Sequence, residues 1–177
     1  DDFLMDLENE ILRDSSDIQT KDNLYLSLKK ILINQRFDQR QEFFEKFEKA
    51  LGVGLDEHPI TTLSWQDVRT IIREHGNITI GAHTENHINL EALSPETATE
   101  EILDSLKIIK ERAGVDVDHF SYPYGRCQLK IDLSSFGLKS AVTTQHSSVS
   151  ESSLNNYFLP RIEAPDDLVL FKYMLMT

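Results

Sequence analysis

The 177-residue sequence has a formal net charge of -12, which argues against long-range attraction to nucleic acid or to an anionic membrane. A hydrophobic content of 40% suits one globular domain, and no apolar run approaches the roughly 20 residues that cross a bilayer. The single cysteine, Cys127, excludes an internal disulfide framework. No charged-then-apolar leader opens the sequence, but this says little, because the abrupt start at Asp1-Asp2 suggests a fragment of a longer protein.

The first fifty residues predict helices. Apolar residues recur at helical spacing in three stripes, over Phe3–Leu12, Leu24–Leu32 and Phe37–Leu51, and Gly52 and Gly54 end the third. Asp14–Asp22, rich in Ser, Asp and Thr, predicts a linker between the first two helices. We interpret residues 1–60 as a helical insertion packed on the domain, in preference to a groove for a partner.

From Thr61 onward the pattern alternates between helix and strand. Ser64 predicts a helix N-cap, with Asp67 completing the capping box, and this helix should stop near Gly76. The β-rich run Asn77–Ala82 predicts a short strand that ends just before a histidine. The sequence therefore predicts a strand end with a titratable, metal-ligating residue beside it.

The remaining elements continue the alternation. Ser94-Pro95 starts a long helix that Gly114 closes, with a buried stripe over Ala98, Ile102, Leu106, Ile109 and Ala113. Extended pieces follow over residues 119–123, 138–144 and 159–162, and a last amphipathic helix begins near Asp166, capped by Asp166 or Asp167. This order predicts an α/β fold with parallel strands, in which chemistry takes place on loops at the carboxyl ends of strands.

Two histidines follow the first strand, in the segment His83-Thr84-Glu85-Asn86-His87. At this spacing just past a strand end, their neutral imidazoles can approach one metal ion, and the Thr84 hydroxyl is expected to hold the turn by a hydrogen bond. Taken alone the pair also fits solvated or capping residues. It is not the helical zinc-protease motif, because Glu85 does not directly follow the first histidine.

A second segment, Phe120-Ser121-Tyr122-Pro123-Tyr124-Gly125, ends the next strand. The aromatic-Pro-aromatic-Gly order predicts a rigid turn with exposed ring faces that suit a sugar. Such a turn also leaves backbone N–H groups that can face a developing oxyanion. Taken alone, the segment is better explained as a plain strand that ends in a turn.

Together, the Gly-Ala-His-Thr-x-x-His-x-x-Leu segment, Leu-Ser-Pro-Glu at the start of a long helix and Phe-Ser-Tyr-Pro-Tyr-Gly resemble the polysaccharide deacetylase family. The resemblance covers about residues 61–177, the later part of the family's domain. It implies an incomplete, distorted (β/α) barrel. It also implies a divalent metal ion, usually zinc, that is bound by His83 and His87.

The resemblance implies further site residues. The Pro-Tyr turn maps onto Pro123 and Tyr124, with Pro123 and Tyr122 as substrate-binding residues and the Tyr124 N–H as the catalytic oxyanion donor. Arg161 is expected to orient a carboxylate, although a surface salt bridge is the simpler interpretation. His146 is the nearest candidate for the family's general acid, but it is better explained as a loop residue.

The departures from the family pattern concern the acids. No strand ending in Asp-Asp, the motif that supplies the general base and the third metal ligand, is present, and Asp1-Asp2 leads into a predicted helix. Ser121 replaces the arginine common in the third motif. We therefore expect weak metal binding and a weak or inactive catalyst in this chain, since general-base catalysis contributes about 10²–10⁴-fold.

The expected function is metal-dependent removal of N-acetyl groups from a carbohydrate, with a bacterial polysaccharide as the substrate. A non-catalytic carbohydrate-binding or scaffold domain on the same fold is the alternative, and hydrolysis of another C–N bond stays open. The missing early strands leave barrel edges uncovered, so a homodimer or an exposed edge is expected. The sequence leaves the cytoplasm and the cell envelope open as locations.

Overall fold

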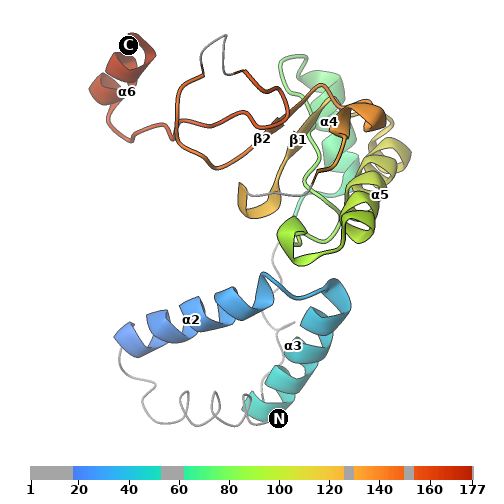
Figure 1. The fold of residues 1–177 in the computed structure, drawn as a ribbon, viewed down its shortest axis with the longest axis vertical. Helices are drawn as coiled ribbons and strands as arrows, with labels where there is room; N and C mark the ends of the chain where they lie inside the picture. Colours follow the sequence, from blue (N-terminus) through green and yellow to red (C-terminus); the bar gives the residue numbers. More distant parts are fainter. Residues whose placement is uncertain (1–17, 53–61, 126–129, 150–153, 177) are drawn as a thin grey trace.

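The computed structural model describes residues 18–52, 62–125, 130–149 and 154–176. The predicted first helix at Phe3–Leu12, the Asp1-Asp2 pair and Cys127 lie outside the described residues. The described elements are, in chain order (Figure 1), α2 (Ile18–Leu32), α3 (Phe37–Leu51), α4 (Trp65–Glu74), η2 (Leu90–Ala92), α5 (Pro95–Ala113), β1 (His119–Ser121), η3 (Pro123–Gly125), η4 (Leu133–Phe136), β2 (Ser140–Val142) and α6 (Leu168–Met176).

Helices α2 and α3 form a pair at one end of the molecule, below the strands in Figure 1. Helix α3 ends as predicted, because Gly52 adopts the left-handed conformation with φ 64°. The predicted linker over Asp14–Asp22 is too long, since α2 already begins at Ile18. Polar residues such as Ser, Thr and Asp cost a helix at most about 0.7 kcal/mol each relative to Ala, so they do not prevent its first turn from forming.

The two helices that flank the predicted first strand have the N-terminal caps that the sequence predicts. In α4 the Ser64 Oγ accepts from the Asp67 N–H at 3.1 Å, and Asp67 accepts from the Ser64 N–H at 2.8 Å. In α5 the Ser94 Oγ accepts from the Thr97 N–H at 3.2 Å. These local bonds satisfy N–H groups that a helix leaves without intrahelical partners, so both starts follow from nearby sequence.

The core lies between α5 and the strands. The predicted stripe of α5 is confirmed: Ala98 and Ile102 are fully buried, and Leu106 and Ile109 pack against the same cluster. The cluster of buried residues is formed by Ala82, Leu90, Ala98, Ile102, Val117, Phe120, Tyr122, Leu133, Leu138 and Ala141. Removing this apolar surface from water stabilises the fold and holds α5 against the strands.

The strands are parallel, as the sequence predicts. β1 and β2 pair with Phe120 opposite Ala141, and single parallel bridges join Ala82 to Phe120 and Val142 to Leu159. Four segments therefore run side by side in chain order. Between the first two, α5 provides the connection that parallel strands require.

The outer two segments are shorter than predicted. The run Asn77–Ala82 pairs only at Ala82, because the Ile78 N–H donates to the His75 carbonyl and stays in the turn after α4. The segment at 159–162 pairs only at Leu159, because the next N–H that faces β2, that of Arg161, donates to the Gln145 carbonyl and not to the Thr143 carbonyl that a continued ladder would use. The described part holds a two-stranded parallel sheet with two added bridges, and the incomplete barrel stays a prediction.

Helix α6 has the predicted cap but not the predicted amphipathic face. The Asp167 carboxylate accepts from the Leu170 N–H at 2.7 Å. Leu168, Val169 and Tyr173 are 64%, 76% and 65% exposed. Nearly all residues of α6 are apolar, so the helix has no polar face opposite an apolar one, and the predicted amphipathic pattern is wrong. Among the described residues, no helix has both the length and the apolar character that crossing a bilayer requires.

Candidate functional site

The predicted site residues follow one another along a single edge of the parallel segments. His83 comes directly after Ala82, Tyr124 follows β1, Thr144 follows β2 and Arg161 follows Leu159. Because parallel strands end at the same edge of a sheet, residues far apart in the sequence are brought together there. This is the edge at which α/β folds bind their ligands.

The two histidines lie side by side. Their ring centroids are 4.7 Å apart with the planes at 78°, and both side chains are exposed. The His83 Nδ1 lies 2.6 Å from the Ser121 carbonyl oxygen. A carbonyl only accepts, so His83 Nδ1 is the donor, and in the neutral imidazole the free lone pair then lies on His83 Nε2. Histidines that bind metals are usually oriented by such a bond from their second nitrogen.

His87 is the other half of the pair. Partial burial is the main cause that lowers the pKa of His87, followed by the nearby His83 imidazole, and the Arg40 guanidinium lowers it further. A lowered pKa keeps the imidazole neutral at neutral pH, the form in which it binds a metal. The His87 ring also meets the Tyr124 ring edge-on, with centroids 4.9 Å apart.

Three residues around the pair have unusual backbone conformations. Thr84, His87 and Tyr124 have φ values of 63°, 51° and 57°, and they are the only non-glycine residues with positive φ in the described ranges. Such conformations cost about 1–3 kcal/mol each and persist only where the surroundings hold them. Their concentration around two imidazoles therefore indicates a functional site.

The hydrogen bonds that hold the turn between the histidines are not the predicted one. The Thr84 Oγ1 is buried and has no hydrogen-bond partner among the described residues, so the expected role of its hydroxyl is wrong. Instead, the Glu101 carboxylate accepts from the Asn86 N–H at 3.1 Å and from Asn86 Nδ2 at 2.9 Å. Arg40 donates to the carbonyls of Asn86 and His87 at 3.2 and 3.3 Å.

Sequence reasoning missed both Arg40 and Glu101. Glu101 carried no sequence signal that separates it from the neighbouring acidic residues Glu100 and Asp104. Arg40 carried a signal: it lies three residues after Phe37 and four before Phe44, on the apolar stripe of α3. A charged residue on an apolar stripe indicates a specific partner, because an unpaired buried charge is costly.

The turn that contains Pro123 and Tyr124 packs against Thr144. Gly125 has φ 71°, and a Cβ built on it would lie 1.9 Å from the Thr144 Oγ1, so only glycine fits. The Tyr124 carbonyl accepts from that hydroxyl at 3.3 Å. No hydrogen bond to the Tyr124 N–H is formed within the described part of the chain.

The expected exposure of Tyr122 and Pro123 is wrong. Tyr122 is 3% exposed, stacks on Phe158 with centroids 5.4 Å apart, and donates its hydroxyl to the Tyr157 carbonyl at 3.0 Å. Pro123 is fully buried. Tyr122 lies on the same face as the buried Phe120, two residues earlier, and Pro123 is buried at the start of η3, so neither ring presents a free face to a sugar. The ring of Tyr124, which is half-buried, remains.

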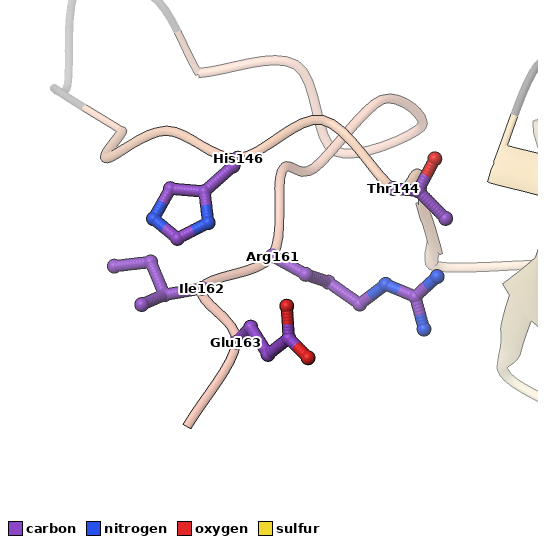
Figure 2. Close-up of a pocket in the computed structure, with 5 residues that line it drawn as sticks. All are labelled: Thr144, His146, Arg161, Ile162 and Glu163. Carbon is purple, nitrogen blue, oxygen red and sulfur yellow. The ribbon is translucent and has the colours of Figure 1, made fainter. Parts of the chain in front are cut away.

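An open cavity of about 390 Å³ lies on the same edge, lined by Thr144, His146, Arg161, Ile162 and Glu163. Figure 2 shows Thr144 and His146 on one segment and Arg161, Ile162 and Glu163 on its neighbour. The Arg161 Nε donates to the Thr143 carbonyl at 2.6 Å, and the Nη atoms have no partner among the described residues. The structure thus places both Arg161 and His146 at this cavity.

The imidazoles of His83 and His87 provide part of the ligand set of a metal site. Catalytic zinc is usually held by three protein ligands. Within residues 18–52, 62–125, 130–149 and 154–176, no group of three or more His, Cys, Asp or Glu side chains is arranged to hold a metal ion. His83 and His87 therefore supply two imidazole donors, and no described carboxylate or thiolate joins them.

Comparisons with known proteins agree on one family. The family model described as Polysaccharide deacetylase matches residues 38–141. This match begins inside α3, ahead of residue 61, where the sequence suggested a boundary; the division into an insertion and a domain stays a prediction. No curated protein matches the chain.

Two solved structures are similar. The Streptococcus pyogenes deacetylase PplD in complex with acetate has 24% sequence identity and a TM-score of 0.52, over 60% of this chain and 47% of that chain. A polysaccharide deacetylase from Bacillus cereus has 20% identity and a TM-score of 0.47, over 57% of this chain and 32% of that chain. The chain thus spans less than half the length of either structure, and the first likeness concerns the fold alone.

Proposed function

This chain belongs to the polysaccharide deacetylase family, and we propose that it is part of a metal-dependent hydrolase that removes N-acetyl groups from a carbohydrate. The observation that carries the proposal is the meeting of His83, His87 and the Tyr124 turn at one edge of the parallel segments. A bacterial polysaccharide is the proposed substrate. The exact sugar is left open.

In this proposal His83 Nε2 and the His87 imidazole hold a divalent ion, with zinc as the proposed metal. When bound, such an ion polarises the acetyl carbonyl and lowers the pKa of a bound water. The bond between His83 Nδ1 and the Ser121 carbonyl supports this role, since it fixes the tautomer that leaves His83 Nε2 free.

The Tyr124 N–H is the proposed oxyanion donor. Its support is geometric: the amide has no partner among the described residues, and the neighbouring ring lies against His87. A fixed N–H aimed at developing negative charge is worth several kcal/mol of transition-state stabilisation. Tyr122 and Pro123 contribute from the core, by holding the turn.

The cavity beside the turn is the proposed binding site for the sugar. The Arg161 guanidinium, anchored by Nε at the Thr143 carbonyl, directs its remaining N–H groups to a carboxylate or to sugar oxygens. His146 in the cavity wall is the proposed proton donor to the leaving amine. Both roles rest on placement at the same edge as the histidine pair.

We propose that the chain by itself is a weak or inactive catalyst. The described residues bring no carboxylate to the two imidazoles, and a site with two neutral ligands binds a dication weakly. The missing general base alone is worth about 10²–10⁴-fold in rate. The proposal also includes a homodimer formed through an exposed strand edge, which analytical ultracentrifugation of the chain would test.

Calorimetric titration with zinc tests the proposed site directly. We expect weak binding of one ion per chain that is lost in both His83→Ala and His87→Ala. His119→Ala is the matched control, because its ring lies on β1 and bonds the Ser140 hydroxyl instead. Absence of zinc binding in the wild type, or equal binding in all three variants, would contradict the proposed metal site.

Titration with an N-acetylglucosamine oligosaccharide, followed by nuclear magnetic resonance, tests the substrate class. We expect shifts at Tyr124 and Arg161 and no release of acetate. Resonance shifts confined to residues away from this edge would contradict the proposed sugar-binding site.

A further inference from the structure

We propose that Arg40 of α3 is a positioning residue for the metal-binding turn, so that the α2–α3 pair is a working part of the site. The inference rests on the proposed function, because it concerns the geometry of His83 and His87. It goes beyond that function by assigning a role to a helix pair that the sequence presented as an insertion.

The first support is the set of bonds made by one guanidinium. Arg40 Nε donates to the Leu32 carbonyl at 2.9 Å, and its two Nη atoms donate to the carbonyls of Asn86 and His87 at 3.2 and 3.3 Å. Leu32 ends α2, whereas Asn86 and His87 belong to the turn. The planar, permanently charged fork of arginine thereby ties the end of one helix to the backbone of a metal-binding residue.

The second support is that the same turn is held from its opposite side. The Asn86 N–H and side-chain amide donate to Glu101, and the Glu85 N–H donates to the Glu101 carbonyl at 3.2 Å. A further pair of bonds joins the turn to the α2–α3 loop, where Asn89 donates to Ile33 and Asn34. The turn is therefore fixed between α5 and the helix pair.

These bonds matter because of the backbone at His87. Its φ of 51° is a conformation that a residue with a Cβ rarely adopts, and it directs the side chain toward His83. If residue 87 relaxed to an ordinary φ, its Cβ would point elsewhere and the rings would no longer lie 4.7 Å apart. Because Arg40 bonds the His87 carbonyl itself, it opposes this relaxation.

The positive charge of Arg40 would by itself weaken the binding of a metal cation. A guanidinium beside a cation site repels the cation, because like charges repel each other. A favourable contribution of Arg40 to metal binding must therefore come from geometry. This contrast separates a positioning role from an electrostatic one.

The test is calorimetric titration of the full 177-residue chain with zinc chloride, comparing Arg40→Gln and Arg40→Lys. Loss of a bond that orients a ligand typically weakens metal affinity by about 10–100-fold, and we expect about 10-fold in both variants. Arg69→Gln is the matched control, because Arg69 of α4 also donates to a backbone carbonyl, that of Arg112, away from the turn. We expect no change in the control.

A second measurement needs no metal. In the metal-free chain, the ring resonances of His87 should shift in both Arg40 variants, while those of His119 should not. Unchanged zinc affinity, or tighter binding by Arg40→Gln, would overturn the positioning role, as would unchanged His87 resonances. If circular dichroism shows that Arg40→Gln does not fold, Arg40→Lys carries the test. A wild type that binds no zinc contradicts the proposed function, and the resonances still decide the role of Arg40.

Discussion

The two halves of the candidate site are held in different ways. The histidine turn is bonded on both sides, to Glu101 of α5 and to Arg40 of α3, and it contains two residues with positive φ. The cavity around Arg161 and His146 is open, and its residues lie on loops. A metal needs ligands placed within a few tenths of an ångström, whereas a sugar tolerates adjustable contacts. Rigidity is thus concentrated where the proposed chemistry demands it.

The largest effect is expected where the two halves meet, at Gly125. Gly125→Ala should destabilise the fold by about 3 kcal/mol, because it adds left-handed strain to a collision with Thr144. Urea denaturation measures the change. Gly137→Ala is the matched control, with φ 82° and no atom within 4 Å of the added Cβ, and should cost only about 1 kcal/mol. Equal costs would mean that the contact with Thr144 adjusts easily.

A smaller effect tests the strain in the rigid half. His87→Gly and His87→Ala both remove the imidazole, so both should lose zinc binding. The glycine variant should be the more stable of the two by about 1 kcal/mol, because residue 87 has φ 51°. At Glu85, whose φ is not positive, the alanine variant should be more stable than the glycine variant. Thermal unfolding compares the four variants, and a more stable His87→Ala would show that the turn relaxes.

The smallest effect on stability is expected in the open half. Arg161→Gln removes an exposed side chain, so unfolding should change by no more than about 0.5 kcal/mol. Zinc binding should stay as in the wild type, while binding of the N-acetylglucosamine oligosaccharide should weaken. Calorimetry with each ligand gives both values. Weaker zinc binding in this variant would show that the two halves are coupled.

Much of this architecture could be predicted because it depends on neighbours in the sequence. The caps at Ser64 and Ser94, the end of α3 at Gly52 and the buried stripe of α5 all rest on contacts within a few residues. The parallel order of the strands followed from the alternation of strand and helix. The two histidine rings lie close together, as their spacing predicted, and their binding of a metal stays a prediction.

Tertiary structure decided what depends on partners distant in the sequence. The amino-acid sequence by itself determined the helices, the order of the parallel segments and the family, because short-range periodicity and local motifs carry them. It did not reveal that Tyr122 points into the core, that the Thr84 hydroxyl finds no bond in the described part of the chain, or that Arg40 reaches a turn 46 residues away. Burial and hydrogen bonding at these positions are set by where other segments pack. No local pattern encodes that placement.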